Sequence, residues 1–264
     1  MNDVLEVRNL TLQFGGIVAV HDLTFDVHRG EFFAIIGPNG AGKTSLFNCL
    51  TGIYTPRGSV KVLGQEIVGR KPNEIARLGV ARTFQNLGLF DSMTPLENIL
   101  VGRDVKMTAG ILAGALRWPA RKSERAARIR AHEILDLMEL NEYADTEVRA
   151  LPYGIRKRIE LAKAAVMDPE LLLLDEPVAG MNREETEEIM GYVSLLREHL
   201  GLTIILIEHD IQLVMDLADR VLALDFGQMI GLGTPEDTQS NERVIEAYLG
   251  VPDEPMPAES RTVS

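Results

Sequence analysis

The sequence predicts an α/β domain with a largely parallel sheet covered on both faces, a small antiparallel β layer and an inserted helical segment. Three observations lead to this fold class. From Leu171 onward, short apolar runs alternate with helix-like stretches. These runs are continuously apolar, which is typical of strands buried on both faces of a parallel sheet. Residues 1–85 instead carry β-rich runs broken by turn residues, whereas residues 86–167 carry apolar positions at helical spacing.

The N-terminal part predicts the antiparallel layer and the first buried strand. Four β-rich runs between turn residues are expected to form the layer: Val4–Val7, Val18–Val20, Leu23–Val27 and Ser59–Leu63. Phe32–Ile36 is apolar throughout and predicts a buried strand, which a helix at Ser45–Leu50 follows. A helix at Lys71–Leu78 and a strand at Val80–Phe84 are expected next.

The remaining elements are expected in two groups. Three helices belong to the inserted segment: Pro95–Val101, Arg125–Leu140 and Ile159–Met167. After it we expect strands at Leu171–Leu174, Thr203–Ile207, Val221–Leu224 and Met229–Ile230, with helices at Glu184–His199 and Ile211–Ala218. We expect residues 1–250 to form one domain, in which 1–85 and 168–250 build the α/β core and 86–167 the helical subdomain. Residues 251–264 are rich in Pro, Glu and Ser, which predicts a disordered tail.

Amino-acid composition and net charge limit the classes of protein to which this chain can belong. The chain has 264 residues, 45% of them hydrophobic, and a formal net charge of −12. This acidic balance argues against a nucleic-acid partner. Cys49 is the single cysteine, so no internal disulfide can form, and we expect it to be a small buried hydrophobe. No run approaches about 18 consecutive apolar residues, so any membrane role is expected to come through a partner.

The segment from Gly37 to Thr44 fits the phosphate-binding pattern G-x-x-x-x-G-K-[ST]. It lies between a predicted strand and a predicted helix, as the motif requires. Glycines let backbone N–H groups close around phosphate oxygens, and the helix N-terminus adds partial positive charge. Lys43 is expected to reach the outer phosphates and Thr44 to ligate Mg²⁺. The predicted nucleotide-binding residues here are Gly37, Pro38, Asn39, Gly40, Ala41, Gly42, Lys43, Thr44 and Ser45.

The ends of two later strands are expected to bring acidic and basic side chains close to the phosphate-binding loop. Asp175 and Glu176 end the strand at Leu171–Leu174, and His209 follows the strand that ends at Ile207. The carboxyl ends of parallel strands lie at the ligand crevice of an α/β sheet. Asp175 suits a Mg²⁺ ligand, Glu176 a general base that polarises an attacking water, and His209 a hydrogen-bond partner of the γ-phosphate or that water.

One segment is basic in an otherwise acidic chain. Residues 103–130 hold eight basic residues against two acidic ones. The segment is either a solvated loop and helix face or a contact for lipid headgroups or an acidic partner surface. The basic residues are Arg103, Lys106, Arg117, Arg121, Lys122, Arg125, Arg128 and Arg130.

The order of these motifs over residues 4–250 resembles the ATP-binding subunits of ABC transporters. The resemblance implies a P-loop NTPase core, ATP and Mg²⁺ as ligands, and a dimer of ATPase subunits. It implies that Phe14 stacks on adenine and that Gln85 contacts Mg²⁺ and senses the membrane subunit. It further implies that Tyr153 and Gly154, in a signature-like loop, face the nucleotide of the opposite subunit.

Four segments resemble the ATPases of branched-chain (hydrophobic) amino-acid importers: 14–20, 175–182, 207–210 and 244–250. This implies membrane permease subunits, a second ATPase subunit of the same or another kind, an indirect link to a substrate-binding protein, and a place at the cytoplasmic face of the membrane. ATPases of urea and amide importers and of lipopolysaccharide exporters are similar in many of these segments. A non-transport ABC ATPase and a non-hydrolysing scaffold are further alternatives. A P-loop kinase or GTPase is disfavoured, because the sequence has no Asn-Lys-x-Asp guanine motif and a signature-like loop followed by Asp-Glu is not expected of either.

The signature-like loop departs from the family pattern. Pro152 stands where the family has a serine whose hydroxyl meets the γ-phosphate, and proline has neither hydroxyl nor N–H. Loss of such a bond could slow closure or hydrolysis about ten- to hundred-fold. Proline suits a helix start, and Arg156, Lys157 and Arg158 add positive charge, so we hypothesise a modified but working loop. Comparing ATPase rates of the wild type and Pro152→Ser tests it, and equal rates would make the hydroxyl irrelevant. A second departure is Asn182, where many members carry aspartate.

Overall fold

The computed structural model describes residues 3–83, 87–107 and 117–249. The side chains of residues 104–107, 117–123 and 249 are also outside this description. Gln85 and the predicted tail at 251–264 therefore lie outside the described residues.

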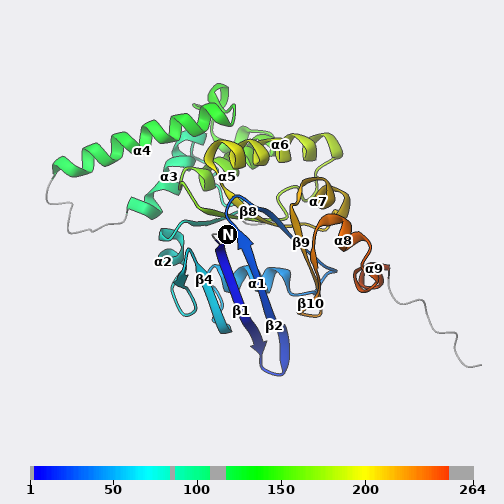
Figure 1. The fold of residues 1–264 in the computed structure, drawn as a ribbon. Coiled ribbons are helices and arrows are strands. Elements are labelled where there is room, and N and C mark those ends of the chain that lie inside the picture. The colour runs from blue at the N-terminus through cyan, green and yellow to red at the C-terminus, as the bar shows by residue number, and fades with distance from the viewer. Residues whose placement is uncertain (1–2, 84–86, 108–116, 250–264) are drawn as a thin grey trace, which may run out of the picture.

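Two sheets form the framework (Figure 1). The small sheet is antiparallel with strand order β2-β1-β4-β5, which confirms the predicted layer. The large sheet has the order β10-β9-β3-β8-β7-β6, and its strands run parallel except for the β9–β10 hairpin at one edge. The strands are β1 (Asp3–Phe14), β2 (Ile17–His28), β3 (Phe32–Ile36), β4 (Arg57–Val62), β5 (Gln65–Glu66), β6 (Val80–Arg82), β7 (Leu171–Asp175), β8 (Thr203–Ile207), β9 (Arg220–Asp225) and β10 (Gln228–Gly233).

Helices cover both faces of the large sheet. In Figure 1, α3 to α6 lie on one side of it, and α1 and the small sheet lie on the other. The core is divided accordingly, since Phe32 and Ala34 of β3 belong to the helix-covered core and Phe33 and Ile35 to the core shared with α1 and the small sheet. The helices are α1 (Lys43–Leu50), α2 (Pro72–Arg77), α3 (Pro95–Met107), α4 (Arg117–Leu137), α5 (Tyr153–Ala165), α6 (Arg183–Leu200), α7 (Ile211–Leu217), α8 (Pro235–Gln239) and α9 (Glu242–Leu249).

The prediction of two strands at 18–20 and 23–27 was wrong. A single strand, β2, runs through both. Its turn-like residue Asp22 adopts φ 52°, where the register with β1 shifts. The bulge satisfies its own polar groups, because the Asp22 N–H donates to Thr11 Oγ1 and its carboxylate accepts from Asn9. A turn signal thus marks a bulge inside a long strand.

The third inserted helix is longer than the apolar run at Ile159–Met167 that predicted it. α5 runs over Tyr153–Ala165, and it begins directly after Pro152, where a helix start was also expected. Its first turns contain Lys157 and Arg158, which hide the apolar periodicity yet are buried. The short strand β5 and the helices α8 and α9 were not predicted at all.

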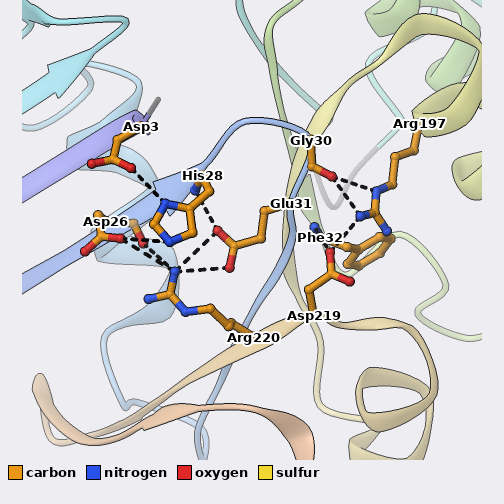
Figure 2. A network of polar contacts seen from close by, with 9 residues as sticks. All are labelled: Asp3, Asp26, His28, Gly30, Glu31, Phe32, Arg197, Asp219 and Arg220. Atoms are coloured by element: carbon orange, nitrogen blue, oxygen red, sulfur yellow. Dashed lines mark hydrogen bonds and ion pairs between the residues drawn. The ribbon is translucent and has the colours of Figure 1, made fainter. Parts of the chain in front are cut away.

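A polar network fixes the approach to β3 (Figure 2). Glu31, in the turn between β2 and β3, is buried and pairs with Arg220 of β9, with Nη1 3.2 Å from Oε1. On the other side of the turn, Arg197 of α6 donates to the carbonyl of Gly30 and pairs with Asp219 at 2.6 Å. The turn before β3 is thereby tied to β9 and α6, and the end of β3 is held in a defined place.

Candidate nucleotide site

The loop after β3 has a shape that its glycines make possible. Gly37 has φ 153°, and a Cβ on it would lie 2.2 Å from the carbonyl oxygen of Leu224 on β9. Gly42, which precedes α1, has φ 99°, and a Cβ there would lie 2.4 Å from the carbonyl oxygen of Ala19. Any side chain at either position would collide with backbone, which explains why both ends of the motif are glycine.

Lys43 is the first residue of α1 and its side chain folds back over the loop. It is buried, and Nζ donates to the carbonyl oxygens of Gly37 at 2.6 Å and Pro38 at 3.1 Å. Burial lowers its pKa, while the nearby carboxylates of Glu176 and Asp175 act in the opposite direction. A phosphate group would favour the charged ammonium for the same Coulombic reason.

A pocket of 370 Å³ opens beside this loop and brings the two halves of the predicted site together. Glu176, from the end of β7, lines the same pocket as Lys43 and Thr44. The full lining comprises Ile17, Val18, Ala19, Asn39, Gly40, Ala41, Gly42, Lys43, Thr44, Ser45, Glu176 and Phe226.

The backbone at Glu176 is strained. Its φ is 47°, a left-handed conformation that costs a non-glycine residue about 1–3 kcal/mol. The Glu176 N–H donates to the carbonyl of Ile207 on β8 at 3.0 Å, which holds this turn in place. Strain of this kind is retained at functional sites when the surrounding structure enforces it.

Asp175 forms an ion pair that the sequence did not predict. Its Oδ2 lies 2.7 Å from Nη2 of Arg82 on β6, and both side chains are nearly fully buried. Arg82 also donates to Asn48 Oδ1 of α1 at 2.7 Å and lies over the ring of Phe47. The guanidinium therefore fixes the carboxylate relative to the helix that follows the phosphate loop.

His209 does not line the pocket, and its side chain is 63% exposed. The preceding residue, Glu208, is completely buried at the end of β8. Its carboxylate accepts from the backbone N–H groups of Val178 and His209 at 3.4 and 3.2 Å. No role was assigned to Glu208 from the sequence, although a charged residue directly after an apolar strand was the signal available.

Phe14, the predicted adenine-stacking residue, is half exposed at the end of β1. It packs edge-on against Tyr54, with ring centroids 5.0 Å apart, and it is not among the residues that line the pocket. Tyr153 and Gly154 form the first turn of α5, with Pro152 as the N-cap residue. Tyr153 is exposed, and a Cβ on Gly154 would meet nothing within 4 Å, so the start of α5 is accessible.

The prediction that Arg156, Lys157 and Arg158 add positive charge beyond Gly154 is only partly correct. Lys157 and Arg158 are buried within the fold. Lys157 pairs with Glu160, and Arg158 donates to the carbonyl oxygens of Met138 and Glu139. Arg158 also pairs with Glu188 of α6, with Nη1 3.6 Å from Oε1, and lies over the ring of Tyr192. Both cations therefore have partners within the fold, as buried charges require.

Asn182 caps α6. Its Oδ1 accepts from the N–H of Glu185 at 3.0 Å, and the Glu185 carboxylate accepts from the N–H of Asn182 in return. Such a capping box stabilises a helix start by satisfying donors that have no partner within the helix.

Part of the basic segment holds the helical segment together. Arg103 donates to the carbonyl of Val166 at 2.7 Å and pairs with Asp168. Arg130 pairs with the same aspartate, with Nε 2.7 Å from Oδ1. The side chains of Lys106, Arg117, Arg121 and Lys122 lie outside the described residues, so the choice between solvated face and docking surface stays open for them.

Comparison with known proteins identifies the family. A model of the ABC transporter family matches residues 20–179. A protein of Pseudomonas aeruginosa, the high-affinity branched-chain amino acid transport ATP-binding protein BraF, is 43% identical over 94% of this chain and 98% of its own length. The chain belongs to the ATP-binding subunits of ABC transporters. It is therefore an ATPase of this family, as its motif order predicted.

Further relatives agree with this assignment. The ABC ATPase is 43% identical to the LivG protein of Escherichia coli and 33% identical to a probable LivG of Archaeoglobus fulgidus, and it covers 98% and 96% of these chains. A model described as a branched-chain amino acid ATP-binding cassette transporter matches residues 228–254. An ATP-binding cassette solved in its ADP conformation superposes with a TM-score of 0.82 at 28% identity, covering 95% of this chain and all of the other. These comparisons confirm the predicted fold class. Within the described residues, no helix has the length and apolarity needed to cross a lipid bilayer.

Proposed function

We propose that this ABC ATPase hydrolyses Mg²⁺-bound ATP to power the uptake of branched-chain amino acids. One observation carries the catalytic part: Lys43 and Thr44 of the phosphate loop and Glu176 of β7 line a single pocket. The substrate class rests on the 43% identity to BraF and LivG and on the match at residues 228–254.

The phosphate loop, Gly37 to Ser45, would bind the triphosphate through the backbone N–H groups that all its residues except Pro38 have, and through the ammonium of Lys43. The Thr44 hydroxyl and the Asp175 carboxylate are oxygen donors beside this loop and suit Mg²⁺, a hard cation. Gln85 completes the proposed ligand set. When bound, Mg²⁺ would neutralise charge on the phosphate oxygens.

Glu176 is the proposed general base. Its carboxylate lies at the pocket and close enough to Lys43 to affect that residue's pKa. It would accept a hydrogen bond from the attacking water and polarise it. His209, which is exposed and does not line this pocket, would donate to the γ-phosphate when the site closes. Phe14 would stack on the adenine ring.

The proposed working unit is a dimer of ATPase subunits, the second being the same chain or a related one. The accessible start of α5, with Tyr153 and Gly154, would face the nucleotide of the opposite subunit. We propose that residues 86–167 act as the helical subdomain that contacts the permease, and that 1–85 and 168–250 form the nucleotide-binding core. The assembly would lie at the cytoplasmic face of the membrane and receive cargo indirectly from a substrate-binding protein.

Reconstitution tests this function. The ATPase is assembled with its permease in vesicles, with ATP on the ATPase side and binding protein on the other. Labelled leucine, urea, sulfate and lipopolysaccharide are compared as cargo. ATP-dependent leucine uptake that is lost with Lys43→Ala supports the proposal. Transport of another cargo without leucine uptake would overturn the substrate assignment.

A further inference from the structure

Glu208 is a buried carboxyl whose place in the fold is unusual. It follows the last residue of β8 and is 0% exposed. Within the described residues, no lysine or arginine forms an ion pair with it, and the His209 ring lies nearby, with Nδ1 3.5 Å from Oε2. A buried carboxyl is costly unless it is hydrogen-bonded, and an apolar residue of similar volume would fill the same space at lower cost.

The hydrogen bonds of Glu208 join the two chain segments that carry the proposed catalytic groups. Oε1 accepts from the N–H of Val178, which lies two residues after Glu176. Oε2 accepts from the N–H of His209. One side chain thus contacts the backbone of both segments beyond the ends of β7 and β8.

A second contact joins the same two strand ends. The Glu176 N–H donates to the carbonyl of Ile207 at 3.0 Å. Glu176 itself adopts the strained φ of 47°, so its conformation needs support from its surroundings. The contacts at Ile207 and at Glu208 lie on either side of the Glu176–Pro177 turn and together define its position.

We propose that Glu208 is a positioning residue for ATP hydrolysis, which holds the backbone after Glu176 and the backbone of His209 in one arrangement. This inference rests on the proposed catalytic role of Glu176. Glu208 does not line the nucleotide pocket, so its contribution is to the rate of the bound complex and not to nucleotide affinity. A shift of about 1 Å in a catalytic group can cost about a hundredfold in rate.

The test is a graded series at position 208 in the assembled transporter. Glu208→Gln keeps the shape but replaces one acceptor oxygen by a donor, and Glu208→Met keeps the volume but removes both acceptors. We expect kcat to fall about three- to tenfold in Glu208→Gln and more than about thirtyfold in Glu208→Met. The KM for ATP and the affinity for a fluorescent ATP analogue should stay within about twofold in both.

Glu31 supplies a matched control. It is also a buried carboxyl that accepts a backbone N–H, from His28 at 2.6 Å, but it lies in the turn before β3 and pairs with Arg220 (Figure 2). Glu31→Gln should lower the melting temperature while kcat stays within about twofold of the wild type.

Two results would overturn the positioning role. One is a wild-type kcat in Glu208→Gln, which decides the matter even if Glu208→Met does not fold. The other is a loss of kcat that comes with an equal loss of ATP affinity and is matched by Glu31→Gln, because it would show a general structural effect. Glu176→Gln is measured in parallel. If it retains turnover, the proposed catalysis fails; if it is inactive while both Glu208 variants are active, only the positioning role fails.

Discussion

Arg82 of β6 and Asp175 at the end of β7 form an ion pair in which Nη2 lies 2.7 Å from Oδ2, with side chains only 6% and 8% exposed. The same guanidinium donates a hydrogen bond to Asn48 Oδ1 of α1. The carboxylate proposed to bind Mg²⁺ is therefore oriented by a cation on the neighbouring strand. This pair connects the end of β7 with the helix that follows the phosphate loop.

Removal of Arg82 should destabilise the protein strongly. Arg82→Met leaves Asp175 buried without this partner, which costs about 3–5 kcal/mol in comparable cases. Arg183 supplies the control, since its ion pair with Glu187 is 93% and 65% exposed and Arg183→Met should cost below about 0.5 kcal/mol. Urea unfolding measures the change in the free energy of unfolding for both variants. Equal unfolding midpoints for the two variants would contradict the importance of the buried pair.

Gly37 and Gly40 of the phosphate loop should differ in how strongly a change to alanine destabilises the protein. Gly37→Ala places a Cβ 2.2 Å from a carbonyl oxygen of β9, whereas a Cβ on Gly40 meets nothing within 4 Å. We expect Gly37→Ala to lower the free energy of unfolding by about 2–4 kcal/mol. Gly40 has φ 86°, so Gly40→Ala should lower the free energy of unfolding only by the strain of a left-handed alanine, about 1–2 kcal/mol. Thermal unfolding distinguishes them, and a more stable Gly37→Ala than Gly40→Ala would refute the steric explanation.

Cys49 should be unreactive in the folded protein. Burial raises the pKa of its thiol to about 12, so very little thiolate is present at neutral pH. A thiol reagent should label the native ATPase at least about 100-fold more slowly than the urea-unfolded chain. Cys49→Ser, which has no thiol, gives the background in each state. Similar labelling rates for native and unfolded protein would show that this part of α1 opens readily.

The carboxyl of Glu208 should make stability depend on pH. Burial raises its pKa above the ordinary 4.5, with the nearby carboxylate of Glu176 adding to the effect, while its hydrogen bonds and His209 act oppositely. The folded state then holds this proton more tightly than the unfolded state. The resulting stability is fully present below 4.5 and is lost as the pH rises through the folded pKa.

Glu208→Gln removes this titration, so the wild type should lose stability relative to the variant as the pH rises above 4.5. Urea unfolding of both proteins across this range gives the difference at each pH. A difference that is constant, or that grows in favour of the wild type, would rule out a raised pKa.

The phosphate loop could be predicted from the sequence because its geometry depends on local backbone requirements. Gly37 and Gly42 stand where any Cβ would meet a carbonyl oxygen, so their spacing is visible in the sequence itself. Glu176 could be placed near the loop because parallel strands that end at one edge of a sheet bring their ends together. The pocket confirms that Glu176 and Lys43 lie together.

Other parts depend on contacts between distant segments and could not be predicted. Arg82 is 93 residues away from Asp175, and nothing in its local sequence indicates a buried partner. Glu208 resembles any polar strand end until its burial is known. The runs at 18–20 and 23–27 were predicted as separate strands because Asp22, between them, is a turn-type residue. Such a residue can equally form a bulge, and only the pairing of β2 with β1 distinguishes a turn from a bulge.

The catalytic role of Glu176 is the central claim, and the phosphate-release rate of Glu176→Gln in the assembled transporter, at saturating Mg²⁺ and ATP, tests it most directly. We expect this rate to fall at least about a hundredfold, with the affinity for ATP within about threefold of the wild type, because the change removes the base and leaves the phosphate loop intact. A rate within about threefold of the wild type would contradict the proposed mechanism.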